Sequence, residues 1–201
     1  MCQLLEAIRV ENGLIRNLKY HQDRMKRTRE ELFNNHNSMD LTEIILSAFV
    51  PDKEKNIIKC RITFANQVDK IELLPYQIPS IASLKLVFDD EIDYTYKFSD
   101  RSRLNELLEK RGNCDDILIV KQGFITDTSY SNVIFFNGKE WLTPTHPLLK
   151  GTQRANLLDE EVIRVADIRP EDLHHFKKAR IINAMIRFED ELDINILNIH
   201  S

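Results

Sequence analysis

The sequence has few cysteines, and their arrangement excludes the sites that cysteines usually build. The 201 residues include three, Cys2, Cys60 and Cys114. They are widely spaced and odd in number, and no Cys-x-x-Cys pair occurs, so we expect neither a disulfide framework nor a metal site. A chain of this length buries a sufficient core without such cross-links. Unpaired thiols are typical of proteins in a reducing compartment.

Long apolar runs and concentrated charge are also missing. No apolar run approaches the roughly 20 residues that cross a bilayer, and the first residues lack the basic-then-apolar layout of a secretory signal. We therefore expect a cytoplasmic protein with no membrane partner. The net charge is −4, and acidic and basic residues are interspersed. This pattern does not provide the basic face of a nucleic-acid-binding protein, so no nucleic-acid partner is expected.

The remaining composition is that of a globular protein, with 42% hydrophobic and 30% charged residues. In the first part, Asn12-Gly13 between two extended runs is a strong hairpin signal. Strands are expected at residues 4–10, 14–18, 56–64 and 69–75. Helical spacing predicts helices at residues 20–33 and 41–49. Pro75 and Pro79 then interrupt the regular pattern, which suits a linker.

We therefore expect two domains, residues 1–78 and 79–201. In the second domain, strands are expected at residues 84–88, 116–120, 124–127 and 132–136. Helices are expected at residues 99–111, where Gly112 would end the helix, and at 151–163. Together the elements predict an α+β fold of two α/β domains with mostly antiparallel sheets.

Lys97 is the first candidate for chemistry. It follows Tyr94 and Tyr96 on an extended approach and precedes an expected helix. Most lysines at such junctions are solvated surface residues. A lysine that is removed from water instead has a lowered pKa and forms a Schiff base with a carbonyl group.

Two further stretches combine polar side chains with turns. Asp127 lies in a stretch of short polar residues, 126–132, between two expected strands. Its carboxylate could pair with a heterocyclic nitrogen or only form a turn. Gly151 and Thr152 open an expected helix, whose N–H groups could bind a phosphate, although threonine also caps helices without any ligand.

Two weaker candidates lie near the ends of the chain. His21 and Arg24 are three residues apart on a helix and share one face. Arg24 could bind a phosphate, or the helix could carry a solvated basic face. Asn183 and Ala184 end an apolar strand, where backbone N–H groups could meet a ligand or the strand could simply stop.

The order of these stretches resembles the class IV aminotransferase family, the fold-type IV group of pyridoxal-phosphate enzymes. The resemblance covers nearly the whole chain. It is densest from residue 115 to 154, where Thr-Asp-Thr-Ser-Tyr-Ser-Asn-Val and Leu-Leu-Lys-Gly-Thr-Gln-Arg follow the family's order and spacing. Glu-Ala-Ile-Arg-Val and His-Gln-Asp-Arg in the first part look like its N-terminal signature.

This resemblance implies a D-amino-acid-aminotransferase-like fold, a homodimer, and pyridoxal 5'-phosphate held between the two domains. Lys97 would bind the cofactor covalently and later move protons at the substrate Cα. Asp127 would hold the pyridine nitrogen, and Asn132 would shape the cofactor loop. Arg24, Thr152 and the backbone at Ala184 would bind the phosphate, and Gly151 and Asn183 are further implied cofactor-binding residues. The candidates for contact with a small-molecule amino substrate are His21, Tyr96 and Arg101.

Details around Lys97 bear on the reaction. The spacing of Lys97, Asp100 and Arg101 looks like the Lys-x-x-Asn-Arg of lyase members, and Ser102 stands where many aminotransferases have tyrosine. This favours 4-amino-4-deoxychorismate lyase, which gives 4-aminobenzoate and pyruvate. A branched-chain or D-amino-acid aminotransferase is the alternative. Asp127 replaces the family's usual glutamate, and the isoleucine usual at the phosphate helix is absent.

A function of another class is also open. The chain begins almost at the Glu6 signature, whereas family members usually have strands before it. A non-catalytic homologue that binds the cofactor or nothing, and acts through protein association, would fit this feature.

Overall fold

A computed structural model describes residues 2–37, 39–48 and 57–201. The chain forms two compact units. Unit 1 contains Met1–Ile78 and Tyr96–Asp100, and unit 2 contains Pro79–Thr95 and Arg101–Ser201. Lys97, which the expected boundary assigned to the second domain, therefore lies in unit 1. The ends of two expected elements, Phe49 and Asn56, lie outside the described residues.

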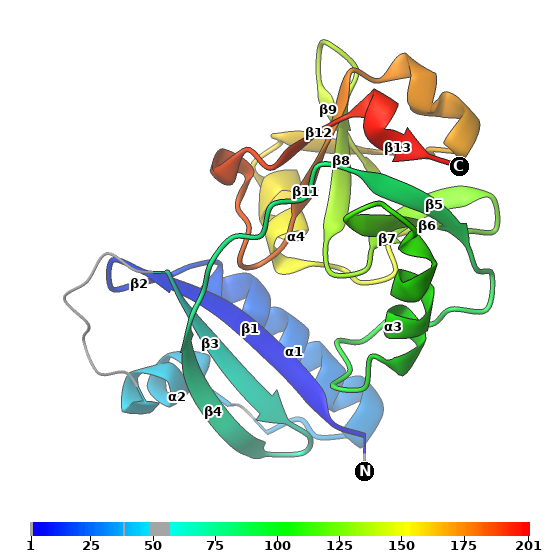
Figure 1. The fold of residues 1–201 in the computed structure, drawn as a ribbon. Helices are drawn as coiled ribbons and strands as arrows, with labels where there is room; N and C mark the ends of the chain where they lie inside the picture. The colour runs from blue at the N-terminus through cyan, green and yellow to red at the C-terminus, as the bar shows by residue number, and fades with distance from the viewer. Residues whose placement is uncertain (1, 38, 49–56) are drawn as a thin grey trace. The chain divides into compact units, whose positions relative to one another are not determined.

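Unit 1 is an antiparallel sheet with helices on one face (Figure 1). Its strand order is β2-β1-β3-β4. The strands are β1 (Leu4–Glu11), β2 (Leu14–Ile15), β3 (Ile57–Phe64) and β4 (Val68–Pro75), and the helices are α1 (Leu18–Phe33) and α2 (Leu41–Ala48). Ile8 of β1 packs with Met25 of α1 and Ile45 of α2 in one buried cluster, so both helices cover the same face.

The predicted hairpin at Asn12-Gly13 is confirmed. Both residues have positive φ, 52° and 76°, which is the backbone that a two-residue turn between β1 and β2 requires. The return strand β2 is shorter than expected and α1 begins at Leu18, two residues early, after Asn17 in the left-handed region.

The segment Tyr96–Asp100 adds to the edge of β1 that faces away from β3. The Leu5 N–H donates to the Lys97 carbonyl at 2.9 Å, and the Ser99 N–H donates to the Gln3 carbonyl at 2.8 Å. The helix expected from Ser99 starts instead at Ser102, because Ser99 is held in this extended pairing.

Unit 2 is built on a nine-stranded sheet whose main path runs β10-β9-β8-β7-β6-β5-β13, with β11 beside β8 and β12 beside β11. Three pairs are parallel, β5–β6, β5–β13 and β9–β10, and the rest are antiparallel. The strands are β5 (Leu84–Phe88), β6 (Asp116–Lys121), β7 (Phe124–Thr128), β8 (Asn132–Phe136), β9 (Trp141–Pro144), β10 (Ile163–Ala166), β11 (Lys178–Ile182), β12 (Asp193–Asn195) and β13 (Ile199–His200).

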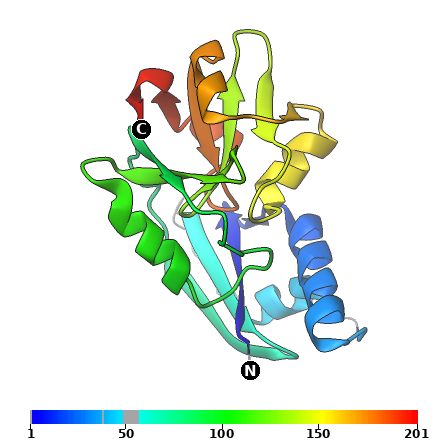
Figure 2. The same cartoon turned by 90° about the vertical axis from the view of Figure 1, so that its right-hand side faces the viewer.

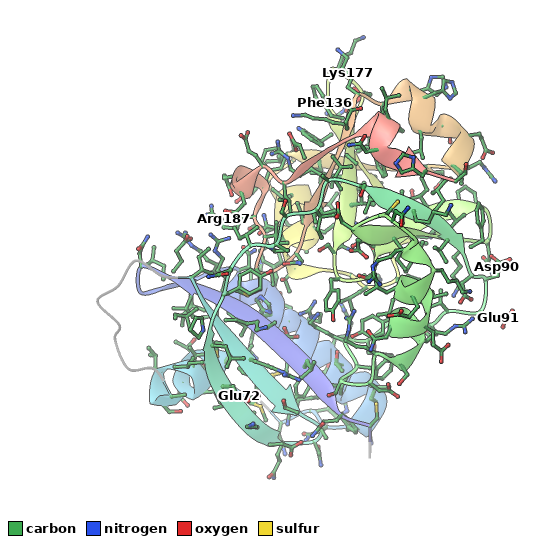
Figure 3. The ribbon with its side chains drawn as sticks, viewed as in Figure 1. Glu72, Asp90, Glu91, Phe136, Lys177 and Arg187 are labelled. Atoms are coloured by element: carbon green, nitrogen blue, oxygen red, sulfur yellow. The ribbon has the colours of Figure 1, made fainter. Side chains whose placement is uncertain are left out.

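Short helices connect these strands (Figure 2). They are α3 (Ser102–Leu108), η1 (Glu109–Arg111), α4 (Thr152–Asp159), η2 (Pro170–His175), η3 (Phe188–Asp190) and η4 (Ile196–Asn198). The helix expected at 151–163 ends at Asp159. Glu161 adopts a positive φ of 56°, and Ile163 already belongs to β10, where it pairs with Trp141 of β9. At the far end of β8, the Lys177 N–H donates to the Phe136 carbonyl at 2.8 Å (Figure 3).

The predicted α+β fold with mostly antiparallel sheets is confirmed. Within the described residues, no helix combines the length and apolar character that a membrane span requires.

Candidate functional site

A buried carboxylate, Glu6, organises the candidate site in unit 1. Glu6 lies on β1 and only 1% of its surface is exposed. Arg24 of α1 donates from Nε to Oε1 at 2.8 Å and from Nη2 to Oε2 at 2.6 Å. Nδ1 of His21, about one turn earlier, lies 2.6 Å from Oε2. His21 and Arg24 therefore share a helix face, and that face meets Glu6.

Charge decides the protonation of this cluster. Burial alone would raise the pKa of Glu6, but Arg24 and His21 reverse the effect and lower it to about 2. Burial lowers the pKa of His21 although Glu6 opposes it, and the charges of Arg24 and Lys97 lower it further. Glu6 is thus ionised near pH 7, and neutral His21 donates its Nδ1 proton to Glu6.

Arg24 keeps one nitrogen for another ligand. Its Nε and Nη2 both bind Glu6, whereas Nη1 has no acceptor among the residues that the structure describes. Guanidinium groups bind carboxylates and phosphates through their separate edges. Arg24 can therefore hold a second anion without releasing Glu6.

Lys97 lies beside this cluster. Its carbonyl pairs with Leu5, the residue before Glu6, and its charge is close enough to lower the pKa of His21. Tyr96 is directed elsewhere, because its hydroxyl donates to Glu31 of α1 at 2.9 Å. The structure thus brings Lys97, His21 and Arg24 together in unit 1 and turns the Tyr96 hydroxyl toward α1.

The β7–β8 hairpin of unit 2 carries a second buried carboxylate. Asp127 lies directly opposite Asn132. Its Oδ1 accepts from Nδ2 of Asn132 at 2.8 Å, and its Oδ2 accepts from the Leu149 N–H at 2.9 Å. The same Asn132 nitrogen donates to the Leu149 carbonyl at 2.9 Å. These bonds join the hairpin to the loop that precedes α4.

Burial raises the pKa of Asp127 to about 6. The Leu149 N–H, Asn132 and the charge of Arg154 each favour the ionised form, but together they do not offset the loss of water. Asp127 therefore titrates just below neutral pH. A protonated heterocyclic nitrogen would supply the positive charge that this carboxylate lacks, which is the partner that a pyridine ring offers.

Gly151 is required by packing. Its φ of −69° is available to any residue, yet a Cβ atom at this position would clash with Oδ1 of Asn132. The absence of a side chain lets Asn132 hold the loop. Glycine is needed here because the Asn132 side chain approaches its Cα closely, and not because the backbone conformation is unusual.

Thr152 begins α4 and is buried, and no acidic residue lies in the first turn. Arg154, two residues on, is also buried and donates to the Pro144 carbonyl at 2.8 Å. The positive end of the helix dipole and the Arg154 charge both favour an anion here.

Asn183 and Ala184 form a tight turn after β11. Oδ1 of Asn183 accepts from the N–H groups of Met185 and Ile186 at 2.7 and 2.9 Å, and its Nδ2 donates to Oγ of Ser131 at 2.9 Å. The Ala184 N–H donates to no acceptor within the described part of the chain. The predicted backbone donor at Ala184 is thus available to a ligand.

Arg101, the third candidate for substrate contact, lies against the same hairpin. Its Nη2 donates to the Ser129 carbonyl at 2.7 Å, and its guanidinium carbon lies 3.7 Å from the centre of the Tyr130 ring. Arg101 and Asp127 are thereby brought to one region of unit 2.

Comparison with known proteins identifies the relatives of this chain. The family model described as amino-transferase class IV matches residues 97–188. A solved structure from Haemophilus somnus, named a putative 4-amino-4-deoxychorismate lyase, is 38% identical, with a TM-score of 0.89 over 94% of this chain and 98% of that one. An uncharacterized protein of Haemophilus influenzae is 39% identical over 92% of this chain and 98% of its own length. A Schizosaccharomyces pombe protein named a putative aminodeoxychorismate lyase is 27% identical over 75% of this chain and 71% of its own.

The chain belongs to the class IV aminotransferase family. It is therefore an enzyme that acts on a small molecule with pyridoxal phosphate as its cofactor, and the predictions of family, enzyme and cofactor are confirmed. Across residues 2–37, 39–48 and 57–201, no group of three or more histidine, cysteine, aspartate or glutamate side chains is placed to hold a metal ion.

Two residues of the site were not predicted. In the sequence, Glu6 is only the first residue of the Glu-Ala-Ile-Arg-Val motif, and Arg154 is only the last residue of the Leu-Leu-Lys-Gly-Thr-Gln-Arg motif. A signal for Glu6 was present, because it is the one charged residue in a strand row otherwise made of Leu4, Ile8 and Val10. Such a residue needs a buried partner of opposite charge. No comparable pattern marks Arg154, which is buried on a helix of mixed polarity.

Proposed function

We propose that this enzyme is a 4-amino-4-deoxychorismate lyase, which releases pyruvate from its substrate and gives 4-aminobenzoate. The observation that carries the proposal is the 38% identical Haemophilus somnus protein of that name, 98% of which is covered by this chain. The Lys97, Asp100 and Arg101 spacing supports the same reaction. This activity would place the protein in folate biosynthesis.

The side chains present fit pyridoxal phosphate. Two donors, Nη1 of Arg24 and the Ala184 N–H, lack acceptors within the described residues, and Asp127 lacks a cation of its own. When bound, the cofactor withdraws electrons from the carbon that carries the substrate amine. Arg24, Thr152 with Gly151, and Ala184 with Asn183 are the proposed phosphate-binding residues.

Lys97 is the proposed covalent anchor and proton carrier. Lys97 lies near enough to His21 for its charge to act on the imidazole, and a lysine amine in its neutral form is the group that forms a Schiff base with an aldehyde. The neutral Lys97 amine would be the base that takes the proton from the carbon bearing the substrate amine. His21 holds Glu6, and Glu6 holds Arg24. This chain of bonds fixes the guanidinium that binds the phosphate.

Asp127 is proposed to keep the heterocyclic nitrogen protonated. Its carboxylate is held by Asn132 and Leu149, so its direction is fixed before the ligand arrives. The positive charge of the ring would then stabilise the ionised form of Asp127 that burial disfavours. Binding of the cofactor is therefore expected to lower the pKa of this carboxyl group.

The test supplies 4-amino-4-deoxychorismate to the purified protein and measures 4-aminobenzoate and pyruvate. Equal amounts of both products are expected from the wild-type enzyme. Lys97→Ala is expected to lower the rate by at least about 10³-fold, because it removes the proton carrier. Lys97→Arg is the matched control, which keeps the positive charge and cannot form the covalent bond.

Turnover of a branched-chain or D-amino acid without any 4-aminobenzoate would contradict the lyase and establish an aminotransferase. Protein that acquires no visible absorption band with pyridoxal phosphate would instead support the non-catalytic homologue. We also propose a cytoplasmic homodimer, for which light scattering after gel filtration should give about 47 kDa, twice the 23.6 kDa of one chain. A mass of one chain at working concentration would contradict the dimer.

A further inference from the structure

Ser131, at the end of the β7–β8 turn, makes a side-chain bond that has no role in the site described above. Only 7% of its surface is exposed. Its Oγ accepts from Nδ2 of Asn183 at 2.9 Å, and this bond joins two segments that are 52 residues apart in the chain. Among the residues that the structure describes, Asn183 is the partner of this hydroxyl group. The bond therefore connects the hairpin that carries Asp127 to the turn that carries Ala184.

The backbone of Ser131 is fixed to Thr128, the residue that follows Asp127. The Thr128 N–H donates to the Ser131 carbonyl at 2.9 Å. In the opposite direction, the Ser131 N–H donates to Oγ1 of Thr128 at 3.1 Å. Both residues are buried, and two bonds between one pair of residues leave the turn between them little freedom. The Ser131 hydroxyl is thus held at a fixed place relative to Asp127.

On the other side of the bond, Asn183 orders the turn that carries the Ala184 N–H. The N–H and the carbonyl of Asn183 bond with the carbonyl and the N–H of Ile186, at 2.9 and 3.2 Å. Its Oδ1 also accepts from the N–H groups of Met185 and Ile186. The turn is therefore closed by its own residues, and only Nδ2 of Asn183 remains to attach it elsewhere.

The Ser131–Asn183 bond attaches this closed turn to the hairpin. The backbone ladder between β11 and β8 ends where Ile182 lies opposite Asn132. Ser131 and Asn183 are the next residues on the two segments, and their side chains bond where the ladder stops. The direction of the Ala184 N–H relative to the hairpin is thus fixed by a side-chain bond beyond the end of the ladder.

We propose that Ser131 is a positioning residue for the cofactor phosphate and acts through Asn183. The inference rests on the proposed function, in which Asp127 holds the ring nitrogen and the Ala184 N–H binds the phosphate. A ring nitrogen and a phosphate that belong to one small molecule are bound together only if their two sites keep a fixed separation. Ser131 maintains this separation, so it favours the phosphorylated ring over the same ring without its phosphate.

The experiment titrates the full chain, freed of cofactor, with 4-deoxypyridoxine 5'-phosphate and with 4-deoxypyridoxine, and measures each Kd by calorimetry. Neither compound has an aldehyde, so neither can bond covalently to Lys97. Ser131→Ala is expected to weaken binding of the phosphorylated compound about fivefold, which corresponds to the loss of one buried hydrogen bond. Binding of the unphosphorylated compound should change less than about twofold, because Asn132 and Leu149 still hold Asp127.

A second variant tests whether Ser131 acts through Asn183. In an Asn183→Ala background, Ser131→Ala should change the Kd of the phosphorylated compound less than about twofold, because the bond is already absent. Thr126→Val is the matched control, since it removes a buried hydroxyl group of β7 that donates to the Ile119 carbonyl of β6 at 3.1 Å. It should leave the ratio of the two Kd values unchanged. Urea unfolding of each variant checks that it is folded before the titration.

Equal weakening of both compounds in Ser131→Ala, or no change in either, would overturn the positioning role. The phosphate site would still stand if the wild type prefers the phosphorylated compound. A fivefold loss that persists in the Asn183→Ala background would also overturn the role, because Ser131 would then act without Asn183. If the wild type binds both compounds equally, the proposed phosphate site fails as well. Neither compound is converted, so these outcomes do not depend on whether the enzyme forms 4-aminobenzoate.

Discussion

Unit 1 and unit 2 each bury a carboxylate among their candidate residues, Glu6 in unit 1 and Asp127 in unit 2, and the two behave in opposite ways. Glu6 and Asp127 are 1% and 5% exposed. Glu6 has a pKa lowered to about 2, and Asp127 has one raised to about 6. Burial raises both, so the difference comes from the partners. Glu6 binds the guanidinium of Arg24 directly, whereas Asp127 binds neutral donors and feels Arg154 only as a nearby charge.

This difference assigns the two groups separate tasks. A carboxylate with its own cation is a fixed anion, which suits Glu6 to hold Arg24. A carboxylate without one is ready to accept a cationic ligand, which suits Asp127 to meet a protonated ring nitrogen. The same burial therefore leaves a carboxylate with its own cation in unit 1 and a carboxylate that could accept a cation in unit 2.

The largest expected effect is the loss of stability when Glu6 is neutralised. Glu6→Gln leaves Arg24 buried without its anion, which should lower the free energy of unfolding by about 3 to 5 kcal/mol. Urea unfolding of the apoprotein at pH 7 measures the loss. Glu72→Gln is the control, because Glu72 pairs with Lys70 at 2.8 Å on β4 at the surface of unit 1 (Figure 3), where water screens the pair, so its loss should be much the smaller of the two. Equal losses of unfolding free energy in the two variants would show that the buried ion pair stabilises the protein no more than the surface pair does.

The next effect uses pH to separate the two carboxylates. The folded pKa of Asp127 is raised, so its contribution to stability is full below the unfolded pKa near 3.9 and is lost as pH rises through 6. The wild-type apoprotein should lose about 2 kcal/mol relative to Asp127→Asn between pH 4 and pH 6. The contribution of Glu6 has the opposite sign, and is lost as pH falls from about 4.5 toward 2.

Urea midpoints of the wild type, Asp127→Asn and Glu6→Gln across pH 2.5 to 8 test both signs. A difference between wild type and Asp127→Asn that is constant from pH 4 to 6 would show that Asp127 titrates normally. Loading with pyridoxal phosphate should remove the slope in that range, because the ring cation stabilises the ionised carboxyl group.

A smaller effect concerns the packing that positions Asp127. Gly151→Ala places a methyl group against Oδ1 of Asn132 and should cost about 1 to 3 kcal/mol in stability, with weaker cofactor binding. In an Asn132→Ala background the same substitution should cost almost nothing. Thermal unfolding of the wild type, the two single variants and the double variant provides the double-mutant cycle. If Gly151→Ala lowers stability by the same amount in the Asn132→Ala background, the contact with Asn132 is not the cause of the loss.

The fold class and the family could be predicted from the sequence, because they depend on local patterns and on the order of motifs along the chain. Asn12-Gly13 determines its hairpin by backbone preference, and the order of Lys97, Asp127 and Thr152 was enough to identify the family. The pairing of Ser99 with Gln3 was not predictable, because it joins residues far apart in the chain and overrides a local helix signal. The clash that requires Gly151 likewise depends on Asn132, which lies on another element. The tasks of Glu6 and Asp127 differ only through their spatial neighbours.

The most direct test of the account is reductive trapping of the cofactor. The protein is loaded with pyridoxal phosphate, treated with borohydride, digested and mapped by mass spectrometry. We expect the reduced pyridoxyl group on the peptide that contains Lys97, in the wild type but not in Lys97→Ala. We expect less of it in Asp127→Asn, because the variant would lose the charge proposed to hold the ring nitrogen. A label on a different lysine, or equal labelling of the wild type and Lys97→Ala, would contradict the assignment of Lys97 as the covalent anchor.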